Sequence, residues 1–477
     1  MVKQIIIFVL LFFLSVHGLV AKVTVPTVFS DNMVLQQQTE VALWGKSSRC
    51  SRVVITASWS KHRTIIHADT SGRWSCHIDT PAAGGPYELV FDDGEKTIIK
   101  NVMIGEVWIC SGQSNMEMPM KGFEGQPVDG AVEMILSAKP SILIRSCNFK
   151  KAKAFTPQEN CEAKWAEHDP VGVADASAVA YFFARRLYDV LDVPIGIINI
   201  SWGGTPIEAW MSREVLESEF AGEVDLSCVV NKVWPERRSH QQPAVLYNGM
   251  LHSVIPYTAK GFIWYQGCFN RRNYNQYRRL QPVFVKMLRD KWENEEMPFY
   301  FTQIAPYGYN DKEPYAGYMM WAQAQTLDHI KNSGMAATHD VGELNCIHPS
   351  NKKVVGDRLA YLALENDYSL KVIDSHTPLP VKFEFRDSAA LVSFDFCEMG
   401  LTPIGTELDG FELAGEDKVF YPAKCHVSDR NKKQIIVCSP QVKKPVAVRY
   451  GMKNFSRAVL FNCYGIPVSP FRSDDWN

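Results

Sequence analysis

The chain has 477 residues, of which 46% are hydrophobic and 21% are charged, as in ordinary globular proteins. This length is too great for one compact domain, so we expect two or three. The formal net charge of −2 argues against nucleic acid or an anionic membrane surface as a partner. Nothing in the composition indicates an oligomeric state.

The amino terminus has the pattern of a secretory signal peptide. Lys3 precedes an apolar run at 5–16, and small residues follow, with cleavage expected after Gly18 or Ala21. The apolar run is too short to span a membrane, and no second hydrophobic span follows. We therefore expect residues 1–21 to be removed and the protein to be exported, to the periplasm or outside the cell.

The remaining chain divides into three regions by its strand and helix patterns. Residues 22–100 contain short alternating strands separated by turn residues, which predicts a β-sandwich-like module. Residues 101–370 alternate strands with helices, which predicts an α/β domain with a mostly parallel sheet in three layers, α/β/α. Residues 371–477 return to strands and predict a C-terminal β module.

Twelve cysteines are scattered along the chain, without the dense spacing of a small disulfide-rich domain. Cys425 and Cys438 flank a predicted hairpin and are the best candidates for a disulfide in an exported protein. Cys110 and Cys397 lie in apolar runs and are expected to be buried thiols. No Cys-x-x-Cys or His-x-x-x-His spacing indicates a metal site, and we expect no cofactor.

Ser114 is the first candidate for chemistry. The apolar run Val107–Cys110 predicts a buried strand, and Ser114 lies on the turn that follows it. That turn lies at the carboxyl edge of the sheet, where α/β folds place their ligands, so Ser114 is a candidate nucleophile. The alternative is a serine that only caps the next helix. Asn115 and Met116 exclude the Gly-x-Ser-x-Gly elbow of α/β-hydrolases.

The segment 105–117, with Gly-Gln-Ser-Asn-Met at its centre, resembles the first block of the SGNH hydrolase superfamily, and more narrowly the sialate O-acetylesterase family. Segments 26–36, 412–417 and 469–476 resemble the same family, so the resemblance spans the mature chain. It implies an SGNH-hydrolase-like α/β/α domain and a serine esterase that removes O-acetyl groups from a sugar substrate, most naturally sialic acid. An acetylesterase of plant polysaccharides such as acetylated xylan is the alternative.

His348 is the candidate base, because it lies in the loop after a late strand and can return to the sheet edge of Ser114. The alternatives are that His348 only completes a helix entry, or that His339 is the base. SGNH enzymes commonly carry Asp three residues before the histidine, and Asn345 occupies that position here. Asp340, at a strand end, is our expected third catalytic residue, with Asn345 or a simple dyad as alternatives.

The oxyanion hole is expected to use the backbone N–H of Ser114 together with the second block. Gly203 and Gly204 lie in the segment 199–210, which resembles that block, although any pair of glycines can form a tight turn.

The third block, at 263–270, departs from the family pattern. Related enzymes have Trp-Tyr-Gln-Gly-Glu-Ser-Asn, whereas Cys268 and Phe269 replace the Glu and Ser here. Gln266 is the expected side-chain donor to the oxyanion, and Asn270 a positioning residue. The replacements leave open a carbohydrate-binding protein with a weakened catalytic site.

Overall fold

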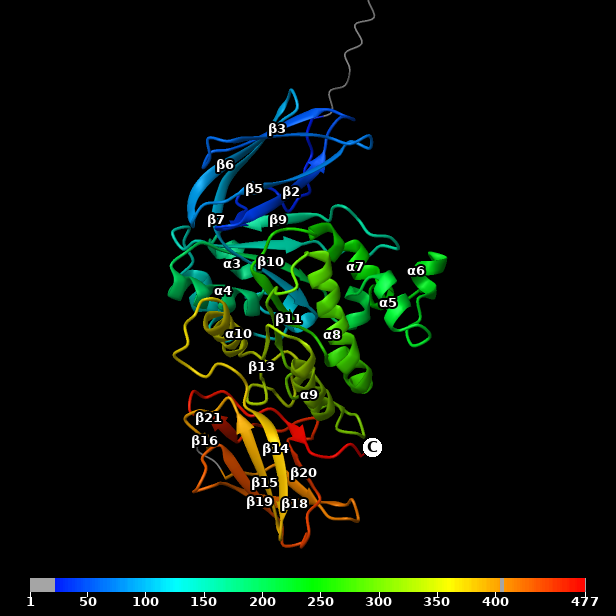
Figure 1. Ribbon diagram of the computed structural model, residues 1–477, viewed down its shortest axis with the longest axis vertical. Coiled ribbons are helices and arrows are strands. Elements are labelled where there is room, and N and C mark those ends of the chain that lie inside the picture. Colours follow the sequence, from blue (N-terminus) through cyan, green and yellow to red (C-terminus); the bar gives the residue numbers. More distant parts are fainter. Residues whose placement is uncertain (1–21, 404–406, 477) are drawn as a thin grey trace, which may run out of the picture.

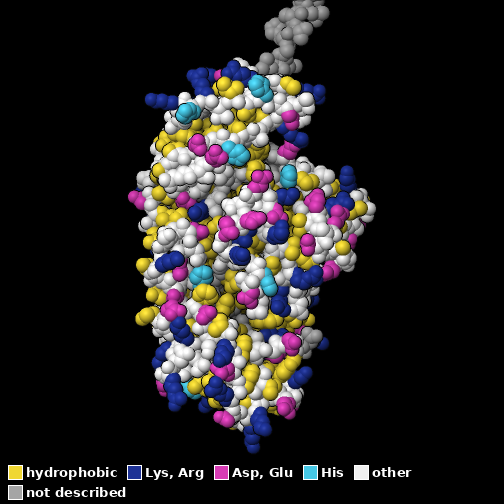
Figure 2. Space-filling view, in the orientation of Figure 1, with side chains coloured by type: hydrophobic (Ala, Val, Ile, Leu, Met, Phe, Trp, Pro, Cys, Tyr) yellow, Lys and Arg dark blue, Asp and Glu magenta, His cyan; other side chains and the backbone are white. Residues whose placement is uncertain are grey.

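The computed structural model describes residues 22–403 and 407–476, so the predicted signal peptide lies outside the described residues. Figure 1 shows three regions stacked along the long axis, with strands at both ends and a helix-covered sheet between them. Basic and acidic side chains are interspersed over the face shown in Figure 2. None of the helices in the described ranges is long and apolar enough to cross a membrane.

The N-terminal region consists of short strands that precede the central sheet and are antiparallel, except that β1 pairs parallel with β7 (Figure 1). Strand β2 pairs with β5, while β3 pairs with β4 and β6. Side chains along β3 alternate between buried and exposed or half-buried, as expected for a strand with one face on a core. The strands are β1 (Val34–Gln36), β2 (Glu40–Lys46), β3 (Arg52–Ala57), β4 (Arg63–His67), β5 (Arg73–Asp79) and β6 (Gly84–Asp92).

Strand β7 (Lys96–Gly112) belongs to both the N-terminal region and the central sheet. Up to Ile104 it pairs antiparallel with β6, and from Glu106 it pairs parallel with β10. The predicted boundary between residues 100 and 101 therefore falls inside one continuous strand. This strand leads directly to Ser114.

The central sheet has the strand order β13-β12-β11-β7-β10-β8-β9. Its neighbouring strands are parallel except for β8 and β9. The chain places β8 and β10 on one side of β7 and β11 to β13 on the other, and such a reversal opens a crevice at the carboxyl ends of the strands. The strands are β8 (Ile144–Phe149), β9 (Ala163–Ala166), β10 (Ile195–Ser201), β11 (Gly261–Tyr265), β12 (Phe299–Thr302) and β13 (Ser333–Ala336).

Helices cover both faces of this sheet because successive strand residues point to opposite faces. Trp108 packs against Phe183 of α4 (Ala178–Leu191), with ring centroids 5.1 Å apart. Trp264 packs against Phe284 of α8 (Tyr274–Lys291), at 4.7 Å. The expected α/β domain with a parallel sheet is confirmed.

Helix α10 packs beside α4 and follows the loop that carries His348. The remaining helices are α1 (Ser114–Glu117), α2 (Ala131–Leu136), α3 (Pro170–Asp175), α5 (Arg213–Glu219), α6 (Ser227–Asn231), α7 (Val245–Gly249), α9 (Tyr315–Gln325) and α10 (Lys352–Asp367). Short 3₁₀ helices are η1 (Ile207–Trp210), η2 (Ser239–Gln241), η3 (Leu251–Val254), η4 (Cys268–Asn273) and η5 (Thr326–His329).

The C-terminal region contains a seven-stranded antiparallel sheet, in the order β14-β15-β19-β18-β17-β20-β22, and a separate pair, β16 and β21. It has its own core, in which Phe411 stacks on Tyr450 with ring centroids 4.4 Å apart. The strands are β14 (Leu379–Arg386), β15 (Ala389–Asp395), β16 (Leu401–Pro403), β17 (Phe411–Ala414), β18 (Phe420–Val427), β19 (Gln434–Cys438), β20 (Ala447–Tyr450), β21 (Leu460–Asn462) and β22 (Phe471–Arg472).

The expected disulfide between Cys425 and Cys438 is not formed. All twelve cysteines lie within the described ranges and are free. Cys425 pairs with Val437 across β18 and β19, whereas Cys438 pairs with Lys424. Because cross-strand partners share a face and neighbours alternate, the two thiols point to opposite faces of the sheet.

Candidate active site

Ser114 and His348 meet at the carboxyl edge of the central sheet. Ser114 is the first residue of α1, immediately beyond β7, and its Oγ lies 2.8 Å from Nε2 of His348. His348 comes from the loop between β13 and α10, and both residues are half-buried. The fold thus brings together the predicted serine and histidine, at a separation suited to proton transfer.

The other ring nitrogen of His348 contacts Gln126, which the sequence did not single out. Nδ1 lies 2.5 Å from Oε1 of Gln126. Because an amide oxygen only accepts, Nδ1 carries the proton and Nε2 is left to accept from the Ser114 hydroxyl. Phe123 packs edge-on against the imidazole at 5.4 Å, and its main chain is hydrogen-bonded to that of Gln126. This loop therefore sets both the tautomer and the orientation of the ring.

The expected orienting role of Asp340 does not fit this geometry. Its carboxylate accepts two hydrogen bonds from Arg358, at 2.7 and 2.6 Å. Arg358 is buried on α10 and needs a negative partner, so it takes the carboxylate that was expected at His348. Asn345 is exposed, and neither it nor Asp340 is hydrogen-bonded to His348 in the described parts of the chain.

The alternative base, His339, is fully buried and turned toward the C-terminal region. Its Nε2 lies 2.8 Å from Oγ of Ser456. His348, and not His339, is therefore the histidine that contacts Ser114.

Lys352 is a buried cation close to this pair. Its ammonium group donates to Oδ1 of Asn115, and Nδ2 of Asn115 donates to the carbonyl oxygen of Ile347 at 3.0 Å. These contacts tie the helix of Ser114 to the loop of His348. Burial lowers the pKa of Lys352 to about 7.

The pKa of His348 is also lowered, to about 4, first by burial and then by the positive charge of Lys352. Among the described residues the ring nitrogens contact Ser114 and the neutral Gln126, and no carboxylate is bonded to the ring to oppose this shift. The imidazole is therefore uncharged, as a base must be, at neutral and mildly acidic pH.

Gly203, one of the predicted oxyanion donors, already has an acceptor within the protein. The N–H of Gly203 donates to Oε2 of Glu117 at 2.5 Å, and Lys151 holds the other oxygen of that carboxylate at 2.6 Å. The N–H of Ser114 has no intrahelical acceptor because Ser114 begins α1. Gly204, in the adjoining exposed turn, has no recorded partner for its N–H in the described ranges. Ser114 and Gly204 are thus the available backbone donors.

Gln266 is fully buried, and both its amide hydrogens are engaged. Nε2 donates to the carbonyl oxygen of Thr205 at 3.0 Å and to Oδ1 of Asn270 at 2.8 Å. Asn270 in turn donates to Oε2 of Glu208 at 2.8 Å, and burial raises the pKa of Glu208. The expected free donor from Gln266 is therefore not found. The network instead ties the turn after β10 to the turn after β11.

Comparison with known proteins agrees with this arrangement. Residues 104–365 match the family described as "Carbohydrate esterase, sialic acid-specific acetylesterase". The chain belongs to this family. It is 27% identical to the sialate O-acetylesterase of Mus musculus over 428 residues, covering 77% of this chain and 78% of the relative. It is also 27% identical to the Homo sapiens sialate O-acetylesterase over 411 residues, with 77% and 75% covered.

A solved structure extends the likeness over the whole described fold. The crystal structure of a carbohydrate acetylesterase from Xanthomonas citri is 31% identical and covers 95% of this chain and 100% of its own, with a TM-score of 0.86. The sequence-based recognition of the family is confirmed, and this member of the sialic acid-specific acetylesterase family is an esterase.

In this acetylesterase family member, the variant third block lies beside the turn that carries Ser114. Cys268 is buried, which raises the pKa of its thiol, while Phe269 is 41% exposed. The N–H groups of Gly267 and Phe269 donate to Oε1 of Gln113, the residue before Ser114, at 3.2 and 3.4 Å. The block thus supports the turn of Ser114 with its backbone despite the changed side chains. No group of three or more His, Cys, Asp or Glu in the described residues is placed to hold a metal ion.

Proposed function

We propose that this protein is an exported serine esterase that removes O-acetyl groups from sialic acid. The observation that carries the proposal is the Ser114–His348 contact of 2.8 Å, with Gln126 behind the ring. The sugar assignment is supported by the mammalian relatives, which are sialate O-acetylesterases, and by the carbohydrate acetylesterase from Xanthomonas citri. The export assignment is supported by the signal-peptide pattern of residues 1–21.

The reaction proceeds through an acetyl-enzyme. Oγ of Ser114 attacks the acetyl carbonyl carbon while Nε2 of His348 takes the hydroxyl proton. The negative oxygen of the tetrahedral intermediate faces the N–H groups of Ser114 and Gly204. When the ester C–O bond breaks, His348 returns the proton to the departing sugar oxygen. Water then attacks the acetyl group by the same route and releases acetate.

Gln126 distinguishes this site from a Ser-His-Asp triad. Its amide oxygen holds Nδ1–H and therefore the productive tautomer of His348. It carries no charge, so it stabilises the imidazolium less than the aspartate of a Ser-His-Asp triad does.

The nucleophile is tested by labelling and substitution together. A fluorophosphonate should modify the wild-type protein once, at Ser114, and the Ser114→Ala variant should lose ester hydrolysis without losing its fold. Modification of a different serine, or substantial activity left in the variant, would contradict the assignment.

The substrate is tested by measuring acetate release from O-acetylated sialic acid and from acetylated xylan at matched ester concentration. We expect a higher kcat/KM on the sialic acid. A preference for xylan would reassign the enzyme to plant polysaccharides. Sugar binding without turnover of any acetyl ester would instead indicate a carbohydrate-binding protein whose site was weakened at Cys268 and Phe269.

Export is tested by sequencing the amino terminus of the secreted protein, which should begin after Gly18 or Ala21.

A further inference from the structure

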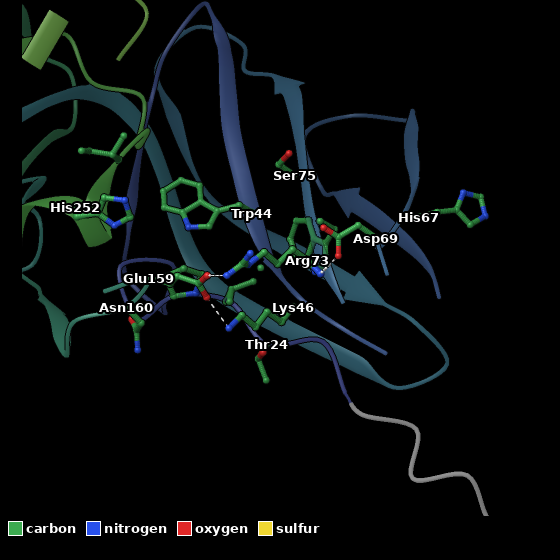
Figure 3. A pocket seen from close by; sticks show the side chains of 15 residues that line it. Thr24, Trp44, Lys46, His67, Asp69, Arg73, Ser75, Glu159, Asn160 and His252 are labelled. Carbon is green, nitrogen blue, oxygen red and sulfur yellow. Dashed lines mark hydrogen bonds and ion pairs between the residues drawn. The ribbon is translucent and has the colours of Figure 1, made fainter. Parts of the chain in front are cut away.

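A cavity of about 650 Å³ lies where the N-terminal strands meet the central region. Its walls come from β2 and β5 on one side, and from residues 159–160 and η3 on the other (Figure 3). Small-molecule sites commonly have this size and often occur where two parts of a fold meet.

The cavity is far from Ser114. Trp44 in its wall packs on Phe29, which stacks on Tyr257, with ring centroids 4.6 and 5.2 Å apart. Tyr257 donates to the carbonyl oxygen of Val34, which pairs with Met103 in β7. From Met103 to the end of β7 the strand advances roughly 30 Å, at about 3.3 Å per residue. A small ligand in this cavity therefore does not reach the reacting ester.

The charges that line the cavity balance one another. Lys46 and Arg73 both form ion pairs with Glu159, that of Lys46 at 2.5 Å, as the dashed lines in Figure 3 show. Asp69 supplies a second carboxylate, whose Oδ1 accepts from the backbone N–H of Arg73 at 2.9 Å. Two cations and two carboxylates give no net charge, which favours a neutral ligand over a phosphate or another anion.

The cavity also offers an aromatic ring on one wall and polar groups on the wall opposite. Trp44 is half-buried, and its Nε1 has no hydrogen-bond partner in the described residues. His252 lies beside it in Figure 3, with Nδ1 engaged by the carbonyl oxygen of Gln158 at 3.0 Å. Asn160 uses Oδ1 to accept from Thr27, and its NH₂ group has no recorded partner within the described ranges. A cavity that holds an aromatic ring, the N–H groups of Trp44 and Asn160 that are unpaired among the described residues, and the ion-paired carboxylate of Glu159 suits a pyranose, which has an apolar C–H face and a rim of hydroxyl groups.

We propose that this cavity is a second carbohydrate-binding site, which holds a neutral sugar residue of a glycan against Trp44. Its hydroxyl groups bond to Glu159 and Asn160. The inference uses the proposed function only in taking the substrate to be a glycan. Because the two sites are separate, a bound chain tethers a glycoprotein that carries many chains and raises the effective concentration of O-acetyl groups at Ser114.

The binding itself is tested without catalysis, on full-length mature protein carrying Ser114→Ala. N-acetyllactosamine and xylohexaose are titrated separately by calorimetry, and at least one should bind saturably. Adding Trp44→Ala should weaken that binding about tenfold or more, because the stacking surface is lost. Trp59→Ala is the matched control: Trp59 belongs to the same region, packs on Tyr87 at 5.5 Å and lies outside the cavity wall, so affinity should not change. Absence of binding by both sugars, or equal loss in both tryptophan variants, overturns the proposal.

A second variant, Glu159→Gln, tests the site independently in case Trp44→Ala does not fold. Glu159 is 41% exposed at its side chain, so Glu159→Gln should fold normally, as circular dichroism can verify, and should weaken sugar binding several-fold. In the active enzyme, Glu159→Gln should raise KM for an O-acetylated sialoglycoprotein and leave kcat/KM for 4-nitrophenyl acetate unchanged. Unaltered affinity in Glu159→Gln and Trp44→Ala would overturn the site. Failure of Ser114 as the nucleophile would not alter the titrations, so the two proposals fail separately.

Discussion

Oε1 of Gln126 lies 2.5 Å from Nδ1 of His348, in the position where a serine triad has a carboxylate. The imidazole that we propose as the base is thus oriented by a neutral group. With burial and the charge of Lys352 both lowering the pKa of His348 to about 4, the imidazole stays neutral well below pH 6.5. A base acts only while neutral, so activity should persist into the acidic range and fall as the pH drops through the pKa of His348.

The variant Gln126→Glu tests this origin of the acid tolerance. A carboxylate at Nδ1 favours the imidazolium and raises the pKa of His348, so the acid limb of kcat/KM should move to higher pH. The measurement is a pH profile on 4-nitrophenyl acetate, for wild type and variant. Gln126→Ala, which removes the acceptor without adding charge, should lower kcat without moving the limb upward to the same extent. An acid limb that stays in place in Gln126→Glu would show that Gln126 does not contact the working imidazole.

Lys352→Met should also move the acid limb upward, because it removes a positive charge that lowers the pKa of His348. With a pKa of about 7, Lys352 is charged throughout the range where His348 titrates. Lys353→Met is the matched control, since Lys353 is largely exposed and pairs with Asp357 at 2.5 Å. Equal profiles for the two lysine variants would contradict the electrostatic role of Lys352.

The Ser114–His348 pairing was predictable because each residue follows a strand end, and parallel strands bring their carboxyl ends to one edge. Gln126 was not. It lies in a loop without periodicity, 222 residues from His348, and glutamine is too common in loops to mark an orienting group. The role expected of Asp340 does not fit the structure, because the partner of its carboxylate depends on which side chain of α10 points toward it. That side chain is Arg358. The spacing of residues along the chain does not show whether Arg358 or His348 binds the carboxylate of Asp340.

The sequence also did not predict that β7 is one continuous strand. Asn101 has a positive φ of 55°, in a stretch where pairing with β6 is irregular. The expected boundary came from the change to an alternation of strands and helices near residue 101, and that change does not show that one strand continues across it. The strand that joins the N-terminal strands to the central sheet was therefore not predictable from these patterns.

Alanine at Gly203 should affect catalysis, whereas alanine at Gly204 should affect stability. A Cβ on Gly203 would lie 3.0 Å from Cβ of Ser114 and 3.2 Å from Oε2 of Glu117, so Gly203→Ala should displace the nucleophile and lower kcat with little loss of stability. A Cβ on Gly204 would meet only Nε2 of Gln241, at an ordinary contact distance of 3.7 Å, but the φ of +67° is unfavourable for alanine, so Gly204→Ala should lower the free energy of unfolding by about 1–2 kcal/mol. Urea denaturation and steady-state kinetics on both variants distinguish the effects. Equal kcat values in the two variants would contradict the close packing of Gly203 on Ser114.

Asp340→Asn separates a structural role from a catalytic one. Asp340 accepts two charge-assisted hydrogen bonds from Arg358, whose side chain is only 6% exposed, so the change leaves a buried guanidinium without its counter-charge. We expect a loss of about 1–3 kcal/mol in the free energy of unfolding. Because Asp340 does not contact His348, the pH profile of kcat/KM should keep its acid limb in the folded variant. Asp357→Asn is a suitable comparison, since Asp357 lies on α10 itself and also forms an ion pair, with Arg186 at 3.1 Å. The contrary result would be an Asp340→Asn variant that stays stable but loses kcat by the orders of magnitude seen when a triad aspartate is replaced, with no such loss in Asp357→Asn. Asp340, and not Gln126, would then be the group that supports the base.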